Sequence, residues 1–219
     1  MKKIINYSAV ILLICIYSAS FAQNTFEGSI TFKISTEGRD LTSQEKAQMP
    51  SEQILQFKGP KSRIDINTPM GSVVTISDAD TKENIVLFDM MGQQLAVKST
   101  KEENEKALAD MPKPEVNDLG ESKEIAGYSC KKYEIKSENS VMTAYITDAI
   151  DATDPQLSNV EGLKGVILEY SVLASEDDEL ILIYTATEVK KAKLKKTLFV
   201  VPSGYQELTP EEFRNMLGG

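Results

Sequence analysis

Residues 120–137, GESKEIAGYSCKKYEIKS, hold Cys130, one of two cysteines in the chain. A thiolate is a nucleophile, and nearby cations lower the pKa of a thiol, so Lys131 or Lys132 would make Cys130 reactive toward oxidants or a partner thiol. Adjacent lysines in a strand point to opposite faces, so at most one of them can act this way. The alternative is a buried thiol, because unpaired cysteine behaves as a small apolar side chain. We expect the buried thiol.

Catalytic groups are otherwise scarce in this chain. It has no histidine, which excludes Ser-His-Asp and Cys-His catalysis and histidine-containing zinc sites. Ser43 with Lys46, and Ser129 with Lys132, match the Ser-x-x-Lys pattern of serine acyltransferases. The supporting Ser-Asp-Asn and Lys-Thr-Gly elements are absent, so we interpret both matches as chance. We therefore expect no catalytic residues and no enzyme.

Three aspartates in TDAIDATDP, namely Asp148, Asp151 and Asp154, carry oxygens of the kind that calcium prefers. The segment lacks the glycine and the distal glutamate of an EF-hand loop. A polar turn before Pro155 is the simpler interpretation. We therefore predict no metal site and no cofactor.

A basic run interrupts an otherwise acidic chain, with lysines at 190, 191, 193, 195 and 196. Lysines on a strand commonly protect an exposed sheet edge from pairing with other chains, which is the interpretation we expect to hold. The alternative is contact with phosphate or with an anionic lipid surface, where each cation contributes on the order of 1 kcal/mol.

The N-terminus has the pattern of a secretory signal peptide over residues 1–22. Two lysines follow Met1, residues 10–16 are apolar, and the small-x-small triplet 20–22 suits cleavage before Gln23. Lipid-attachment sites have a small residue directly before the cysteine, whereas Ile14 precedes Cys15. The sequence therefore predicts a periplasmic or secreted protein with a cleaved signal peptide and no lipid anchor.

The chain after this segment, residues 23–219, has the size of one domain. Loss of Lys2 and Lys3 leaves 22 basic and 33 acidic residues, so the net charge changes from −9 to −11. This acidity argues against a nucleic-acid partner, whose phosphates are bound by clustered cations. After the signal peptide, no segment approaches the roughly 20 apolar residues of a membrane-spanning helix.

Period-two alternation predicts a half-buried strand over residues 25–35. Capping boxes at Thr100 with Glu103 and at Thr209 with Glu212 predict short helices, and a third is expected over residues 43–48. Further strands are expected over residues 53–58, 62–66, 72–77, 84–89, 93–98, 127–137, 141–147, 165–174, 179–188 and 194–202.

Apolar residues occupy both parities in segments 85–88, 166–168, 180–184 and 198–201, so these strands need cover on both faces. We therefore predict a mainly β (α+β) fold, with a strongly curved antiparallel sheet, or incomplete barrel, and a few short helices over its concave face. Around Cys130 the buried parity changes near Lys131 and Lys132, which indicates either a β-bulge there or a twist of the strand between two environments.

Six segments carry a family resemblance, which covers nearly the whole chain after the signal peptide. In order, they are FEGSITFKIS, GPKSRIDI, EIAGYSCKKYEI, YITDAI, GVILEY and FVVPSGYQEL. They resemble an uncharacterised domain-of-unknown-function family of secreted bacterial proteins, which is similar in fold to the LolA/LolB-type lipoprotein carriers. The resemblance implies one open β-barrel domain over residues 23–219 whose concave apolar face is lidded by helices. It supplies no catalytic residues.

These observations lead to two functional hypotheses. The first is a non-enzymatic periplasmic binding module that shelters a lipid, an acyl chain or another apolar ligand; no ligand-binding residues can be named from the sequence. The alternative is an envelope structural or protein-interaction factor whose core is filled by side chains and which binds a protein partner. A filled or an open concave face distinguishes the two.

Overall fold

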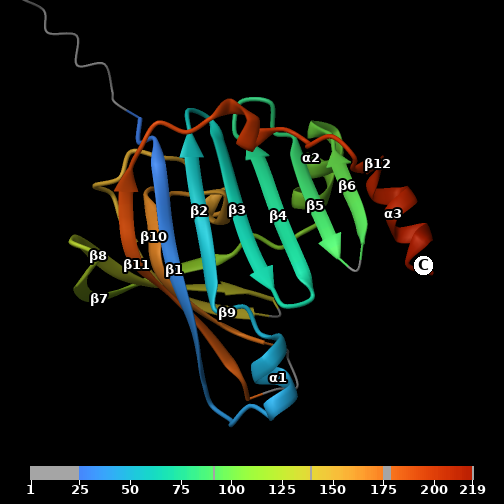
Figure 1. Ribbon diagram of the computed structural model, residues 1–219. Helices are drawn as coiled ribbons and strands as arrows, with labels where there is room; N and C mark the ends of the chain where they lie inside the picture. The colour runs from blue at the N-terminus through green and yellow to red at the C-terminus, as the bar shows by residue number, and fades with distance from the viewer. Residues whose placement is uncertain (1–24, 91, 139, 175–178, 219) are drawn as a thin grey trace, which may run out of the picture.

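The computed structural model describes residues 25–90, 92–138, 140–174 and 179–218. Their strands form one twelve-stranded sheet in the order β12-β6-β5-β4-β3-β2-β1-β11-β10-β9-β8-β7. Neighbouring strands are antiparallel, except that β12 runs parallel to β6. The sheet curves strongly and does not close, as Figure 1 shows. The predicted fold class is confirmed.

The strands and helices follow the predicted meander closely. The strands are β1 (Gly28–Glu37), β2 (Glu52–Lys58), β3 (Lys61–Thr68), β4 (Gly71–Asp78), β5 (Asn84–Met90), β6 (Gln93–Ser99), β7 (Glu115–Ile125), β8 (Tyr128–Ser137), β9 (Ser140–Thr147), β10 (Val166–Leu173), β11 (Ile181–Lys191) and β12 (Gln206–Leu208). The α-helices are α1 (Ser43–Gln48), α2 (Lys101–Ala109) and α3 (Pro210–Met216), and the 3₁₀ helices are η1 (Pro155–Leu157) and η2 (Lys196–Phe199).

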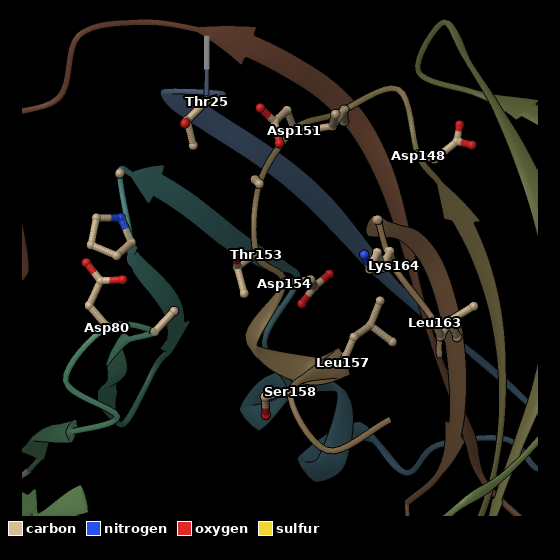
Figure 2. Close-up of a pocket in the computed structure, with 16 residues that line it drawn as sticks. Thr25, Asp80, Asp148, Asp151, Thr153, Asp154, Leu157, Ser158, Leu163 and Lys164 are labelled. Atoms are coloured by element: carbon tan, nitrogen blue, oxygen red, sulfur yellow. The ribbon is translucent and has the colours of Figure 1, made fainter. Parts of the chain in front are cut away.

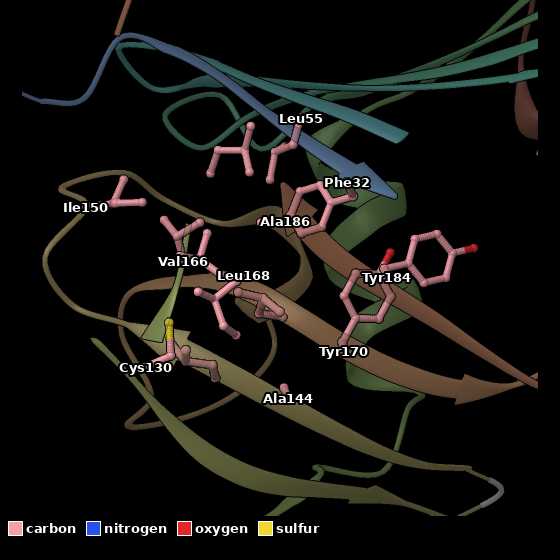
Figure 3. Close-up of a cluster of buried hydrophobic side chains, with 14 of the residues drawn as sticks. Phe32, Leu55, Cys130, Ala144, Ile150, Val166, Leu168, Tyr170, Tyr184 and Ala186 are labelled. Atoms are coloured by element: carbon pink, nitrogen blue, oxygen red, sulfur yellow. The ribbon is translucent and has the colours of Figure 1, made fainter. Parts of the chain in front are cut away.

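The main core lies between the two arms of the curved sheet. Figure 3 shows β1 and its neighbours above and the strands β8 to β10 below, with buried side chains filling the space between them. Phe32 and Leu55 come from the upper arm, and Val166 and Leu168 from the lower arm; all four are 0% exposed. Side chains therefore pack this half of the concavity solidly.

A second, smaller core lies on the outer face of β3 to β6. There Val74, Ile76, Leu87 and Ala96 are buried against Phe199. Phe199 belongs to residues 192–205, which we call the C-terminal strap because they run along the outer face from β11 to β12 (Figure 1).

Arg63 ties the strap to the sheet. Its Nη1 donates to the Leu198 carbonyl oxygen at 2.7 Å, and its Nε donates to Asp65 at 2.8 Å. Both arginine and aspartate lie on the outer face, so the ion pair helps to orient the donor that holds the strap. The strap is therefore held against the outer face of this arm.

Capping boxes start all three α-helices, as predicted for two of them. Thr42, Thr100 and Thr209 each accept from the backbone N–H of the glutamate three residues later, and that glutamate accepts from the threonine N–H. None of the three α-helices contains a buried residue. Local caps therefore stabilise these helices more than burial does.

Three parts of the predicted secondary structure were wrong. Residues 194–202 are not a strand; they belong to the strap and include η2. The strand β7 was not predicted at all, and neither was the short β12. Residues 194–202 were mistaken for a strand because they are rich in apolar residues at both odd and even positions. These residues are apolar because they pack on the outer core, not because they belong to the sheet.

Two further predictions concern targeting and membranes. The predicted signal peptide, residues 1–22, and Cys15 lie outside the described residues. Within the described ranges, no helix is long and apolar enough to cross a membrane.

Cys130 is a buried thiol, as expected. It is 1% exposed, and its Sγ donates to the Tyr128 carbonyl oxygen at 3.4 Å. Burial raises the pKa of the thiol to about 11, and the cation that opposes this rise is Lys123 rather than Lys131 or Lys132. The activation of Cys130 by an adjacent lysine is therefore wrong.

The change of buried parity in β8 is real, because Cys130 and Ile135 are both buried. The predicted bulge, however, lies in the neighbouring strand. The register shifts between Asp118 and Ser122 of β7, whereas β8 pairs with β9 continuously from Lys131 to Ser137. An irregular edge strand thus accommodates the change of environment along β8.

In a chain lacking residues 1–22, we expect a maleimide pulse to label Cys130 at least about a hundredfold more slowly in the native protein than in urea, because the buried thiol is rarely a thiolate. Mass spectrometry measures the labelled fraction over time. The variant Val141→Cys serves as a control, since Val141 is exposed on β9 and its thiol should react quickly. Equal rates at the two positions would contradict the buried assignment.

Candidate functional site

The inner face of β3 to β6 is the continuation of the concave surface that holds the main core. Cross-strand register defines it, because directly opposed residues point to the same face. One row runs from Leu55 of the core through Ile64, Thr75 and Val86 to Val97. The next row runs from Gln53 through Ile66, Val73 and Phe88 to Leu95.

This inner face is apolar and only partly covered. Ile64, Ile66, Val73, Val86 and Phe88 are all half-buried, neither enclosed nor fully exposed. On the outer face of the same strands the strap buries Val74, Ile76 and Leu87, while Ile85 stays half-buried. These strands are therefore apolar on both faces, as predicted for segment 85–88.

Two helices border the inner face. The Phe213 ring of α3 stacks on Phe88, with ring centroids 5.0 Å apart and planes at 15°. Leu108 of α2 lies at the opposite end of the strands, where it lines a small pocket of about 350 Å³ with Ser62 and Ser77. The two helices thus border the inner face at both ends of its strands, and Ile66 and Val73, in the same cross-strand row as Phe88, stay half-buried between α3 and the main core.

Exposed methionines lie at one end of these strands, Met70 in the turn between β3 and β4 and Met90 at the end of β5. Met70 and Met90 are 53% and 36% exposed, and Met90 is the register partner of Gly71. Methionine is flexible and polarizable, and it is often found at surfaces that adapt to varied apolar partners. This end of the strands therefore extends the apolar character of the inner face.

A buried polar cluster lies within the main core. Tyr170 of β10 donates its hydroxyl to the Gln53 Oε1 of β2 at 3.1 Å, and this contact joins the two arms of the sheet. Gln53 is 2% exposed, and its Nε2 has no hydrogen-bond partner. Tyr184 stacks on Tyr170 with ring centroids 4.4 Å apart.

Gln156 of η1 belongs to the same cluster. Its Nε2 is also buried, and its side chain is close enough to the Tyr170 hydroxyl for a hydrogen bond to lower the pKa of that group. Burial raises the Tyr170 pKa above its ordinary value, while Gln53 and Gln156 oppose that rise. Sequence reasoning missed this cluster, although Gln53 shares the parity of the buried residues Leu55 and Phe57.

A groove of about 870 Å³ adjoins the small pocket of about 350 Å³, with which it shares Pro60, Ala79, Thr153 and Ser158, and it opens between the loop from β9 to β10 and the turns that follow β2 and β4. Its lining includes Ile150, Leu157 and Leu163 together with several acidic residues, which Figure 2 draws as sticks. This groove contains all three aspartates considered above as calcium ligands.

The three aspartates do not converge. Figure 2 shows Asp148, Asp151 and Asp154 pointing to different parts of the groove. Asp148 and Asp151 are exposed, whereas Asp154 is 2% exposed and its two oxygens accept from backbone N–H groups of Ile167 at 2.9 Å and Gln156 at 3.0 Å. Among the described residues no group of three potential metal ligands occurs. Asp154 is therefore a structural anchor of the loop.

The Ser-x-x-Lys matches do not assemble a catalytic pair. Ser43 and Lys46 lie on the exposed helix α1. Lys132 instead forms an ion pair with Glu121 at 2.9 Å, which raises the lysine pKa, so this lysine is not available as a neutral base.

The lysines of the basic run lie at the end of β11 and along the strap. β11 is an interior strand between β1 and β10, so the interpretation as protection of a sheet edge is wrong. No ion pair to any of the five lysines is found in the described part of the chain, although Lys193 contributes to lowering the pKa of Glu27. Their contact with an anionic surface stays a prediction.

These features place the chain in a class of proteins with a curved, unclosed antiparallel sheet. One half of its concave face is packed with buried side chains, and the other half is apolar but incompletely covered. The chain belongs to the family of the domain of unknown function DUF4412, whose profile matches residues 26–157, more than half of the chain. The predicted domain-of-unknown-function family is thus confirmed. No curated protein matches the sequence.

Solved structures show where this fold occurs. Two structures of PNGF-II, in the C2 and P21 space groups, have TM-scores of 0.58 and 0.56 at 16% identity. Each comparison covers 88% of this chain but only 33% of the PNGF-II chain, so the chain spans about a third of the length of PNGF-II. At this identity the likeness concerns the fold alone.

Two further structures have lower similarity. They are lipoprotein LppX from Mycobacterium tuberculosis, with 9% identity over 77% of this chain and 89% of LppX, and the LolA superfamily protein NE2245 from Nitrosomonas europaea, with 9% identity over 81% and 91%. Their TM-scores are 0.36 and 0.26. The chain is therefore similar to a LolA superfamily protein, but too weakly to support an inference about ligands.

Proposed function

We propose that the protein is a non-enzymatic periplasmic binding module that shelters an acyl chain or another apolar ligand on the inner face of β3 to β6. The observation that carries this proposal is the unequal cover of the two faces. Val74, Ile76 and Leu87 on the outer face are buried under the strap, whereas Ile66, Val73 and Val86 on the inner face stay half-buried. An apolar ligand over these residues would remove the remaining surface from water.

Acyl chains suit such a surface for a general reason. Each methylene group that leaves water contributes about 0.8 kcal/mol, without any need for directed polar contacts. The interior of the main core is filled by buried side chains, and the groove of about 870 Å³ at its edge is lined by acidic as well as apolar residues. The ligand is therefore placed beside this core and not inside it.

The packed core also favours the second hypothesis, an envelope structural or protein-interaction factor that carries no ligand. In that case, the inner face would be covered by a partner protein. Native mass spectrometry of protein purified from its own envelope distinguishes the two: a co-purifying lipid supports the binding module. An apo mass, together with no uptake of a fluorescent fatty acid, would exclude it.

We expect Val73→Asn to weaken binding of a fluorescent fatty acid about tenfold, because the ligand would have to strip water from an amide that finds no partner on an apolar face. Fluorescence titration measures the Kd. Val141→Asn is the matched control, since Val141 is an exposed strand residue far from this face in the sheet order. A loss of affinity of the same size in both variants would argue against the inner face as the site.

A further inference from the structure

The small pocket of about 350 Å³ beside α2, which we call the α2 pocket, is lined by a polar row of the sheet. Three of its lining residues, Ser62 of β3, Ser77 of β4 and Asn84 of β5, are successive register partners on the inner face. The next row of the same face includes the apolar residues Ile64 and Val86. The inner face therefore changes from apolar to polar at the end where the α2 pocket lies.

The side chains of this polar row have no partners within the protein. In the described part of the chain, no hydrogen bond is found to the side chain of Ser62, Ser77 or Asn84. Ser62 is only 4% exposed, yet it lines the pocket. Buried hydroxyl groups in native proteins nearly always have a hydrogen-bond partner. A molecule bound in the α2 pocket would supply the partner that Ser62 lacks.

The charged residues that line the α2 pocket are already neutralised. Lys82 forms an ion pair with Glu105 at 2.6 Å, and Asp78 forms one with Lys61 at 3.0 Å. An ionic ligand would therefore find no unpaired opposite charge in the lining. The unpaired groups are hydroxyls and an amide, which both donate and accept hydrogen bonds. This combination suits a neutral ligand group that also does both, and a hydroxyl is such a group.

Hydrogen bonds hold the wall formed by α2 in place. The Asn104 Nδ2 donates to the Lys82 carbonyl oxygen at 2.8 Å, which joins α2 to the turn between β4 and β5. Leu108, Pro60 and Pro155 add apolar surface to the lining. The α2 pocket thus has a fixed wall, apolar sides and a few placed polar groups, as small-molecule sites commonly have.

Resting on the proposed function, we propose that the α2 pocket binds the hydroxyl-bearing head group of the acyl ligand, such as the glycerol group of an acylglycerol. Ser62, Ser77 and Asn84 contact its hydroxyls. Side chains two positions apart on a strand share a face, so Ile64 follows Ser62, and Val86 follows Asn84, along the inner face. The acyl chain leaves the pocket over these apolar residues.

The test compares 1-decanoylglycerol with methyl decanoate as competitors of a fluorescent fatty acid, because the two share an acyl chain and only the first has hydroxyl groups. We expect the wild type to bind 1-decanoylglycerol about tenfold more tightly. In the double variant Ser62→Ala with Ser77→Ala, this preference should fall to about twofold while the affinity for methyl decanoate is kept. Ser72→Ala is the matched control, because Ser72 is a half-buried serine of β4 on the opposite face.

Thermal unfolding of each variant separates misfolding from loss of the site. If the double variant does not fold, Asn84→Ala tests the same polar row. Equal affinity of the wild type for the two ligands, or an unchanged preference in the folded variants, would overturn the head-group pocket and leave the proposed function standing. Failure of the wild type to bind either ligand or the fluorescent fatty acid would overturn the proposed function, and the head-group pocket with it.

Discussion

Replacing Phe32 with alanine is expected to lower the free energy of unfolding by about 3–5 kcal/mol, which is the usual cost of removing a buried phenylalanine. Phe32 is 0% exposed and packs edge-on against Tyr170, with ring centroids 6.4 Å apart. It lies between the arms of the sheet, so both arms lose contacts when the ring is removed. Urea unfolding followed by circular dichroism measures the change.

Two variants make the result interpretable. Phe32→Leu should cost much less, because it leaves a smaller cavity. Phe213→Ala removes a half-buried ring of α3 that stacks on Phe88. It should lower the free energy of unfolding by about 1 kcal/mol. If Phe32→Ala were no more costly than Phe213→Ala, the half of the concavity around Phe32 would not be the solid core described here.

Much of this fold could be predicted from the sequence because most strands bury one face. In β1, for example, Ile30, Phe32 and Ile34 are buried and alternate with polar residues, so period two is directly visible. The adjacent apolar residues of segment 85–88 correctly indicated cover on both faces. Leu87 is buried under the strap, and Phe88 lies under α3.

The edges of the sheet could not be predicted in this way. β7 is polar almost throughout, with Ile125 its one buried residue, because an edge strand gains its stability from backbone pairing with β8. For the strap the error was the opposite one, because a strand was predicted where none forms. Its apolar residues pack on the outer face from a 3₁₀ helix and loops, and local sequence spacing does not reveal which distant surface they cover.

The candidate site was beyond local sequence reasoning for a related reason. Gln53 and Tyr170 are 117 positions apart, and only the curvature of the sheet brings them together. A glutamine at a buried parity, in line with Leu55 and Phe57, was the available signal. That signal indicates a buried polar group, but it does not identify the partner on β10.

The stability of the protein is expected to depend on pH through Asp154. Burial raises the pKa of this carboxyl from 3.8 to about 6, opposed by the backbone N–H groups of Ile167 and Gln156. Between these values the folded state holds a proton that the unfolded chain has released. The contribution of Asp154 to stability is therefore fully present below about pH 4, and about 3 kcal/mol of it is lost as the pH rises through about 6.

The variant Asp154→Asn isolates this effect, because an amide does not titrate and other carboxylates affect both proteins equally. We expect the unfolding free energy of the wild type, minus that of Asp154→Asn, to be about 2 kcal/mol larger at pH 4 than at pH 7. Urea unfolding at both pH values measures this difference. Asp151→Asn is the matched control, since Asp151 is an exposed aspartate in the same loop. A constant difference for Asp154→Asn would mean that Asp154 is not buried as described, and that the loop from β9 to β10 is not held to the core through this carboxyl.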